Sequence, residues 1–207
     1  MSTRKANPET PELEPQAIQK KPSDMAVIAA LAYPGTEDQL GKVWSRMTEL
    51  PFKIVPYADG ESLQTILAEL VADVDIADDF VLVPANVLPC KPVDLDELSV
   101  PYVYTTAYGE RKYDSRVPMK FSKASLVEHL AGAAEMDDEA FLHTYFDTYR
   151  HYPVEVGFSY GNFITPVLRG NPCESVVMEA LVRKRFISAS QEGYKAISSL
   201  IENTLLS

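Results

Sequence analysis

Residues 76–95, IADDFVLVPANVLPCKPVDL, decide the fold of this chain. They begin with an apolar run at residues 80–83 and end in a loop that contains Pro84, Pro89 and Pro92. A short apolar run bounded by polar residues and prolines indicates a buried strand. In open α/β folds the crevice that binds ligands lies at the carboxyl ends of such strands. We therefore predict that the loop beginning at Pro84 borders the functional site.

The residues before this stretch repeat the same pattern. Two further strands are predicted at residues 25–33 (MAVIAALAY) and 52–56 (FKIVP). Between the strands we expect two helices. The first runs from about Thr36, which stands at capping-box spacing from Gln39, to about Leu50. The second spans residues 63–74 and has apolar residues on one face. The β-α-β-α-β order predicts an α/β fold with three layers and a mostly parallel sheet.

The second half of the chain has a different pattern. Residues 100–106 are predicted to form a strand, and residues 118–121 are short and apolar. Helices are expected at residues 123–134, 137–150, 171–185 and 191–206. Residues 160–174 combine glycine, proline and asparagine, which is typical both of functional loops and of loops that pack a helix onto a sheet. We expect one α/β domain at residues 24–207, with its C-terminal helices beginning at about residue 123.

Residues 1–23 contain four prolines and few large apolar side chains. Such a segment buries too little surface to offset its ordering entropy, so we predict a flexible N-terminal arm. No apolar run approaches the roughly 20 residues that span a bilayer, and no signal sequence is recognised. We expect a cytoplasmic protein, or one within a phage particle produced there.

Charge and cysteine content exclude several classes of function. The formal net charge of −11 argues against nucleic-acid binding and against an anionic membrane surface, since both require basic residues. The two cysteines, Cys90 and Cys173, have no CxxC spacing and no neighbouring histidine, so we interpret them as ordinary thiols.

Four short segments together resemble a known family. Residues 80–87 (FVLVPANV) and 91–95 (KPVDL) resemble a segment of glycosyltransferase-like proteins with a GT-A type fold, and of the related capsular-polysaccharide ("stealth") phosphotransferases. Residues 116–123 (RVPMKFSK) are similar to the family's His-x-Pro-Met-x-Phe-Asn-Lys segment. Residues 160–162 (YGN) match a Tyr-Gly-Asn near its C-terminal part. The resemblance covers about residues 25–165 and implies a nucleotide-sugar-binding core.

The chain departs from that family at the residues that hold its metal. Ala85 and Asn86 stand where the family has two aspartates, and Arg116 stands where it has a histidine. Alanine cannot ligate a divalent cation and asparagine offers only a neutral oxygen. Arginine cannot act as a base at neutral pH, although it can bind a phosphate. We therefore expect no metal cofactor, and a site that is degenerate by the family's pattern.

Other acids and the histidines offer weaker candidates. Asp78 and Asp79 are expected at the amino end of their strand, far from the crevice. Three acids at residues 137–139 suit the first turn of a helix, where negative charge is favourable. The three histidines have no spacing typical of a metal site or a nucleophile–base pair. The outline GxSxG at residues 157–161 lacks the strand–turn–helix context of a nucleophile elbow.

Two functions stay open on these residues. The first is a glycosyltransferase-like protein that binds a nucleotide-sugar and, if active, transfers a sugar or sugar-phosphate without the usual metal. Its candidate substrate-binding residues are Asn86, Arg116, Lys123, Asn162 and Arg169, with the arginines placed to neutralise phosphate. The alternative is a non-enzymatic structural or interaction protein, for example a phage-encoded particle component whose residues 1–23 bind a neighbouring chain.

Overall fold

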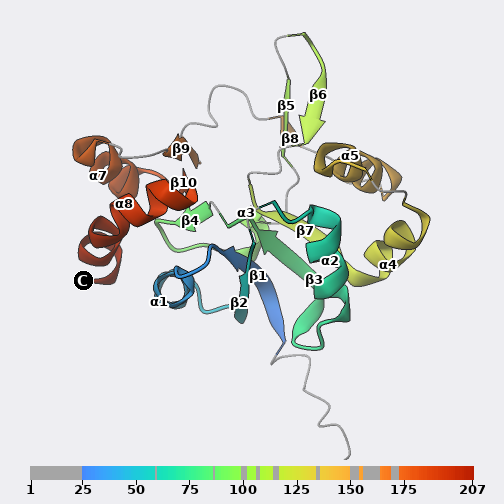
Figure 1. The fold of residues 1–207 in the computed structure, drawn as a ribbon, viewed down its shortest axis with the longest axis horizontal. Helices are drawn as coiled ribbons and strands as arrows, with labels where there is room; N and C mark the ends of the chain where they lie inside the picture. The colour runs from blue at the N-terminus through green and yellow to red at the C-terminus, as the bar shows by residue number, and fades with distance from the viewer. Residues whose placement is uncertain are drawn as a thin grey trace, which may run out of the picture.

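A computed structural model describes residues 25–58, 60–85, 87–98, 102–105, 108–113, 117–133, 136–149, 154–155, 164–168 and 173–207. The N-terminal arm predicted at residues 1–23 lies outside this part of the chain. The described elements form an α/β structure whose central sheet carries helices on both faces (Figure 1).

The central sheet has four strands in the order β2-β1-β3-β7. The strands β1 (Ala26–Ala32), β2 (Phe52–Pro56) and β3 (Ile76–Val83) are parallel, and β7 (Met119–Ser122) runs antiparallel to β3. The crossovers between the parallel strands contain α1 (Glu37–Met47) and α2 (Leu63–Ala72). The predicted β-α-β-α-β start and the mostly parallel sheet are therefore confirmed.

Local sequence explains where the two crossover helices begin and end. Ser62 precedes α2, and its side chain accepts a hydrogen bond from the Thr65 N–H, as expected of a helix N-cap. Thr36 precedes α1 but does not cap it, because its hydroxyl donates to the Tyr33 carbonyl at 2.8 Å. The helix ends at Met47, and Thr48 is already extended.

Alternate residues of the central strands enter two separate cores. On one face Ile28 and Val81 pack with α1, α7 (Glu174–Arg183) and α8 (Gln191–Ile201). On the other face Leu31 and Phe80 pack with α2, α4 (Lys123–Gly132) and α5 (Asp138–Thr148). Figure 1 shows these two groups of helices on opposite sides of the sheet. Such burial on both faces explains why the strands are continuous apolar runs.

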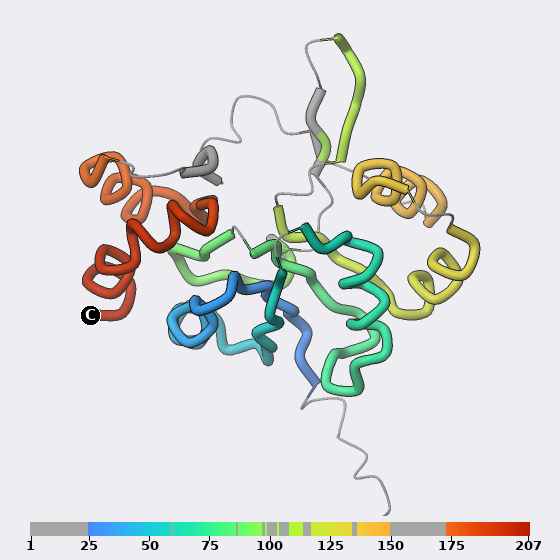
Figure 2. The backbone as a smooth tube through the Cα atoms, viewed as in Figure 1, coloured from blue at the N-terminus to red at the C-terminus, as the bar shows by residue number. Residues whose placement is uncertain are grey.

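The C-terminal elements complete the first core. The π-helix η2 (Glu202–Leu206) follows α8 directly. Gln39 of α1 donates to the Ser198 hydroxyl at 2.9 Å, and Arg46 donates to the Ser207 carbonyl at 2.7 Å. The last helices of the chain therefore lie beside one of the first, as the tube of Figure 2 shows. In the described part of the chain, no helix is long and apolar enough to cross a bilayer.

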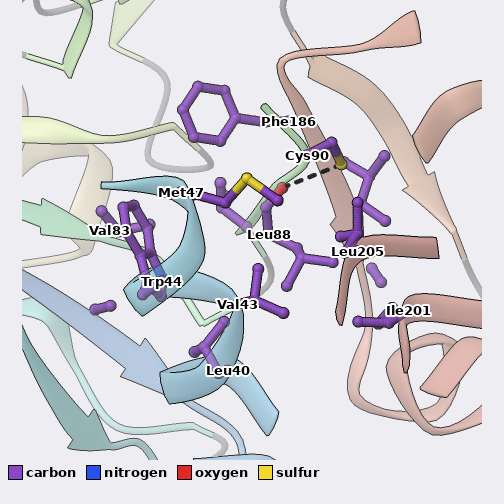
Figure 3. Packing of buried hydrophobic residues seen from close by; sticks show 14 of the residues in the cluster. Leu40, Val43, Trp44, Met47, Val83, Leu88, Cys90, Phe186, Ile201 and Leu205 are labelled. Atoms are coloured by element: carbon purple, nitrogen blue, oxygen red, sulfur yellow. Dashed lines mark hydrogen bonds between the residues drawn. The ribbon is translucent and has the colours of Figure 1, made fainter. Parts of the chain in front are cut away.

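A second sheet, which the sequence did not predict, joins the loop after β3 to the C-terminal helices. Its strands are β4 (Val87–Pro89), β10 (Phe186–Ala189) and β9 (Ile164–Leu168), in the order β4-β10-β9. β10 is antiparallel to β4, and the Cys90 N–H donates to the Arg185 carbonyl at 2.8 Å just beyond the pair. Our expected helix at residues 171–185 ends at Arg183 because Phe186 and its neighbours pair with β4. Figure 3 shows Phe186 and Cys90 near side chains of α1 and η2.

A third, small sheet stands out from the rest of the chain (Figure 1). It contains the hairpin of β5 (Tyr102–Thr105) and β6 (Arg111–Tyr113), with β8 (Val154–Glu155) beside β5. The Tyr113 hydroxyl donates to Asp147 of α5 at 3.1 Å, and Lys112 forms an ion pair with Glu139 at 2.7 Å. These contacts hold β6 against α5. The short helix α3 (Leu95–Leu98) precedes the hairpin.

The packing of β10 gives the first testable prediction. Phe186 is 0% exposed in the first core, so Phe186→Ala removes a ring that neighbouring side chains cannot fully replace. We expect a loss of about 3–5 kcal/mol in the free energy of unfolding, measured by urea denaturation. Val182→Ala is the matched control, because Val182 on α7 is 57% exposed. Equal effects of the two changes would contradict the assignment of β10 to the core.

Candidate functional site

A cavity of about 270 Å³ lies at the carboxyl ends of the parallel strands. The loop after β3 contributes Pro84 and Ala85 to its wall, so this loop borders the cavity with its first two residues, and its role in a functional site stays a prediction. The other lining residues come from β1, β3, β7, α2 and α5 or from the loops after β1 and β2: Leu31, Tyr33, Tyr57, Glu61, Leu63, Ile66, Leu82, Met119 and Asp138. The cavity therefore has the location at which open α/β sheets bind ligands.

Two tyrosines form an aromatic side of this cavity. Tyr33 follows β1 and Tyr57 follows β2, and the Tyr57 N–H donates to the Ala32 carbonyl at 2.9 Å. Their ring centroids are 6.0 Å apart in an edge-to-face arrangement. Both rings are partly exposed, whereas Leu31 and Leu82 beside them are buried. The cavity therefore combines an apolar floor with accessible aromatic rings.

Two carboxylates complete the described wall. Glu61 lies in the loop before α2, where its Oε2 accepts from the Ala58 N–H at 3.4 Å. Asp138 begins α5, and its Oδ1 accepts from the Leu63 N–H at 2.9 Å. This bond joins the first turn of α5 to the first turn of α2, two segments 75 residues apart in the chain. A carboxylate that accepts a backbone N–H at a helix N-terminus is electrostatically favoured there.

Most of the predicted substrate-binding residues lie outside the described residues. Asn86, Arg116, Asn162 and Arg169 all belong to this group. In the sequence Asn86 follows Ala85 directly, and Arg116 stands three residues before Met119. Their assignment to the site stays a prediction.

Lys123, the remaining predicted residue, is described and lies at the other end of β3. Its Nζ donates to the carbonyl oxygens of Asp73 and Ile76, at 2.6 and 2.8 Å. Ile76 begins β3, whereas the cavity lies at the carboxyl end of this strand, about 20 Å away at the rise of an extended strand. Lys53 forms an ion pair with the Asp73 carboxylate at 2.6 Å beside it. Lys123 therefore stabilises the turn between α2 and β3.

The other acids considered from sequence occupy separate positions. Asp78 and Asp79 are exposed in the first half of β3, away from the cavity. Asp137 is the N-cap of α5 and accepts from the Ala140 N–H at 2.8 Å. Glu139 pairs with Lys112 of the hairpin. Of the three acids at residues 137–139, only Asp138 lines the cavity.

The two described histidines have partners within the α4–α5 region, and His151 lies outside the described residues. The ring of His129 lies edge-on to Phe141, and its Nε2 is 3.1 Å from the Thr144 hydroxyl. Burial lowers the pKa of His129. His143 Nδ1 is 2.8 Å from the Asp147 carboxylate on the next turn. Neither histidine lines the cavity.

Four residues of the site were missed by the sequence reasoning: Tyr33, Tyr57, Glu61 and Asp138. Tyr33 and Tyr57 carried a usable signal, because each directly follows a predicted parallel strand. Glu61 stands in the loop that leads from the second strand to α2. Asp138 carried no such signal, since only the packing of α5 against α2 brings it to the cavity.

The divalent metal that the family resemblance implies does not fit the described wall. Ala85 presents only a methyl group at the position of one expected aspartate. Across the described residues, no group of three or more histidine, cysteine, aspartate or glutamate side chains could hold a metal ion. We therefore derive no chemistry through a metal held by the protein.

Comparison with known proteins finds structural likeness among solved structures. No protein-family model matches the chain, and no curated protein matches it. Among solved structures, one that matches is a glycosyltransferase involved in the glycosylation of the major capsid of PBCV-1. The two share 13% sequence identity with a TM-score of 0.42, and the match covers 78% of this chain and 92% of that chain.

The two cysteines differ in environment, which gives a prediction for their reactivity. Cys90 is buried, and burial raises its pKa to about 12. Cys173 is exposed beside Ser175, and hydrogen bonds from the Ser175 side chain and backbone lower its pKa. Since the thiolate is the reactive form, a chromogenic thiol reagent at pH 8 should rapidly modify Cys173 alone in the folded chain.

Raising the pH from 7 to 9 should accelerate the modification of Cys173. The modification of Cys90 should stay slow, because the Cys90 thiol stays mostly protonated below its raised pKa. Unfolding in guanidinium should expose the second thiol. Cys173→Ser should abolish the fast phase. Rapid modification of both thiols in the folded protein would contradict the burial of Cys90.

Proposed function

We propose that this chain is a glycosyltransferase-like protein that binds a nucleotide-sugar at the cavity beyond β1, β2 and β3. The observation that carries the proposal is the position of Ala85. The residue that aligns with the family's metal-binding motif lines a cavity at the carboxyl edge of a parallel sheet. The sequence resemblance and the location of the cavity both support this proposal.

The proposed protein binds without a metal held by paired aspartates. A nucleotide-sugar carries a diphosphate whose charge must be neutralised, and Ala85 with Asn86 cannot hold the cation that does so in the family. Guanidinium groups match phosphate oxygens geometrically and stay charged at neutral pH. We assign this role to Arg116 or Arg169, with Asn86 and Asn162 as polar contacts. If the protein turns over, it transfers a sugar or sugar-phosphate.

The second candidate is a non-enzymatic structural or interaction protein on the same fold. The same methyl group of Ala85 favours it, because a wall without the family's ligands lacks that family's means of activating a leaving group. In this case residues 1–23 bind a neighbouring chain, for example within a phage particle.

Calorimetric titration of the full chain with a panel of nucleoside diphosphate sugars, with and without Mn²⁺, separates the two candidates. We expect at least one nucleoside diphosphate sugar of the panel to bind, with an affinity that Mn²⁺ does not increase. Ala85→Leu should weaken binding roughly tenfold or more, because the larger side chain enters the cavity. Val74→Leu is the control, since Val74 is 75% exposed. No heat with any member of the panel would refute nucleotide-sugar binding.

Restoring the family's carboxylates tests the alignment itself. The double variant Ala85→Asp/Asn86→Asp adds two carboxylates, of which the one at position 85 joins a wall that already contains Glu61 and Asp138, so we expect it to gain Mn²⁺ binding and Mn²⁺-dependent thermal stability. Ala85→Asn is the control of similar size without charge and should gain neither. A folded double variant that does not bind Mn²⁺ would show that position 85 is not equivalent to the family's metal ligand.

A further inference from the structure

We propose that the cavity takes the uncharged, hydroxyl-bearing ring of its ligand, a glycosyl or ribosyl unit, and that Glu61 and Asp138 accept hydrogen bonds from its hydroxyl groups. The phosphates of the same ligand stay outside the described wall. This inference rests on the proposed function for the identity of the whole ligand, but its contacts involve only described residues.

The charge of the described wall excludes phosphate from it. Two side chains that line the cavity are carboxylates, and none of the described lining residues is a lysine or arginine. A phosphate group placed beside Glu61 and Asp138 would be repelled by like charge. A neutral group that donates hydrogen bonds meets no such repulsion. The described wall therefore selects hydrogen-bond donors over anions.

The carboxylates have oxygen atoms available for hydroxyl donors. An ionised carboxylate has about four lone-pair sites. Asp138 uses Oδ1 for the Leu63 N–H, which orients the side chain and leaves Oδ2 without a hydrogen-bond partner among the described residues. Glu61 has one long contact, at 3.4 Å, to the Ala58 N–H. Vicinal hydroxyl groups on a ring present two donors at the spacing of the two oxygens of one carboxylate.

The other lining groups suit a ring with apolar C–H faces. Tyr33 and Tyr57 present partly exposed rings 6.0 Å apart, and Leu31, Leu82 and Met119 form a buried apolar floor. Sugar rings have one face of C–H groups, which packs on aromatic and aliphatic side chains, and an edge of hydroxyl groups. The cavity offers a partner to both.

The size of the cavity limits how much of the ligand enters. Its volume of about 270 Å³ falls below the roughly 300–1,000 Å³ of pockets that enclose a whole drug-sized ligand. A nucleotide-sugar contains two sugar rings, a base and a diphosphate. We therefore infer that one ring unit of the ligand occupies the described cavity, and the wall chemistry favours a neutral one.

The test uses neutral fragments as probes. The full chain is titrated with a panel of methyl glycosides, with a panel of nucleosides and with inorganic pyrophosphate, and binding is followed by ligand-observed NMR. We expect one of the two neutral panels to contain a ligand, and the panel that does so identifies the ring as glycosyl or ribosyl. Pyrophosphate should not displace that ligand.

Variants link the binding to the cavity. Glu61→Gln and Tyr57→Ala should each weaken binding of the neutral ligand roughly tenfold or more, since a hydrogen bond to a charged group and a ring contact are lost. Glu69→Gln is the matched control, because Glu69 is an exposed acid on the outer face of α2. Asp138→Asn retains an acceptor for the Leu63 N–H and should weaken binding with little change in thermal stability.

The outcomes separate this inference from the proposed function. If nucleoside diphosphate sugars bind but the neutral probes do not, or if pyrophosphate displaces the neutral ligand, the inference is overturned and the proposed function stands. If a neutral probe binds and Glu61→Gln weakens it while no nucleoside diphosphate sugar binds, the inference stands and the proposed function fails. Binding of a neutral probe that Glu61→Gln and Tyr57→Ala leave unchanged also overturns the inference.

Discussion

The pairing of β1 with a parallel strand on each side is the constraint on which the rest of this structure depends. β1 bonds to β2 through one edge and to β3 through the other, and its side chains enter both cores. A strand without exposed edges satisfies its backbone groups through the two neighbouring strands, and the helices on each face of the sheet cover its apolar side chains. The order β2-β1-β3 then brings the ends of the three strands together, so Tyr33, Tyr57 and Ala85 meet although their sequence positions are far apart.

A single carboxylate connects this sheet edge to the second half of the chain. Asp138 begins α5 and accepts from the first residue of α2, so it contributes to the start of two helices and to the wall of the cavity. The aromatic cluster of α5, in which the ring centroids of Phe121 and Tyr145 are 5.1 Å apart, holds α5 against β7 behind it. The acidic wall of the cavity therefore depends on tertiary packing that also stabilises the second core.

The central sheet was predictable because its signals are local. Continuous apolar runs and the periodicity of residues 63–74 each depend on neighbours within one helix or strand. The second sheet was not predictable in the same way. β4 has three residues and β10 has four, and neither shows a period of its own. Their strand conformation depends on pairing between residues about 100 positions apart, as Leu88 with Ile187 shows.

The sequence by itself determined the fold class and the strand whose end borders the cavity, because these follow from residue type and short-range order. Only the tertiary structure decided which acids reach the site. Asp138 lines the cavity while its neighbours Asp137 and Glu139 bind elsewhere, and Lys123 lies at the opposite end of β3. The physical reason is that successive helix residues point about 100° apart, so the packing of α5 determines which one of three adjacent carboxylates lines the cavity.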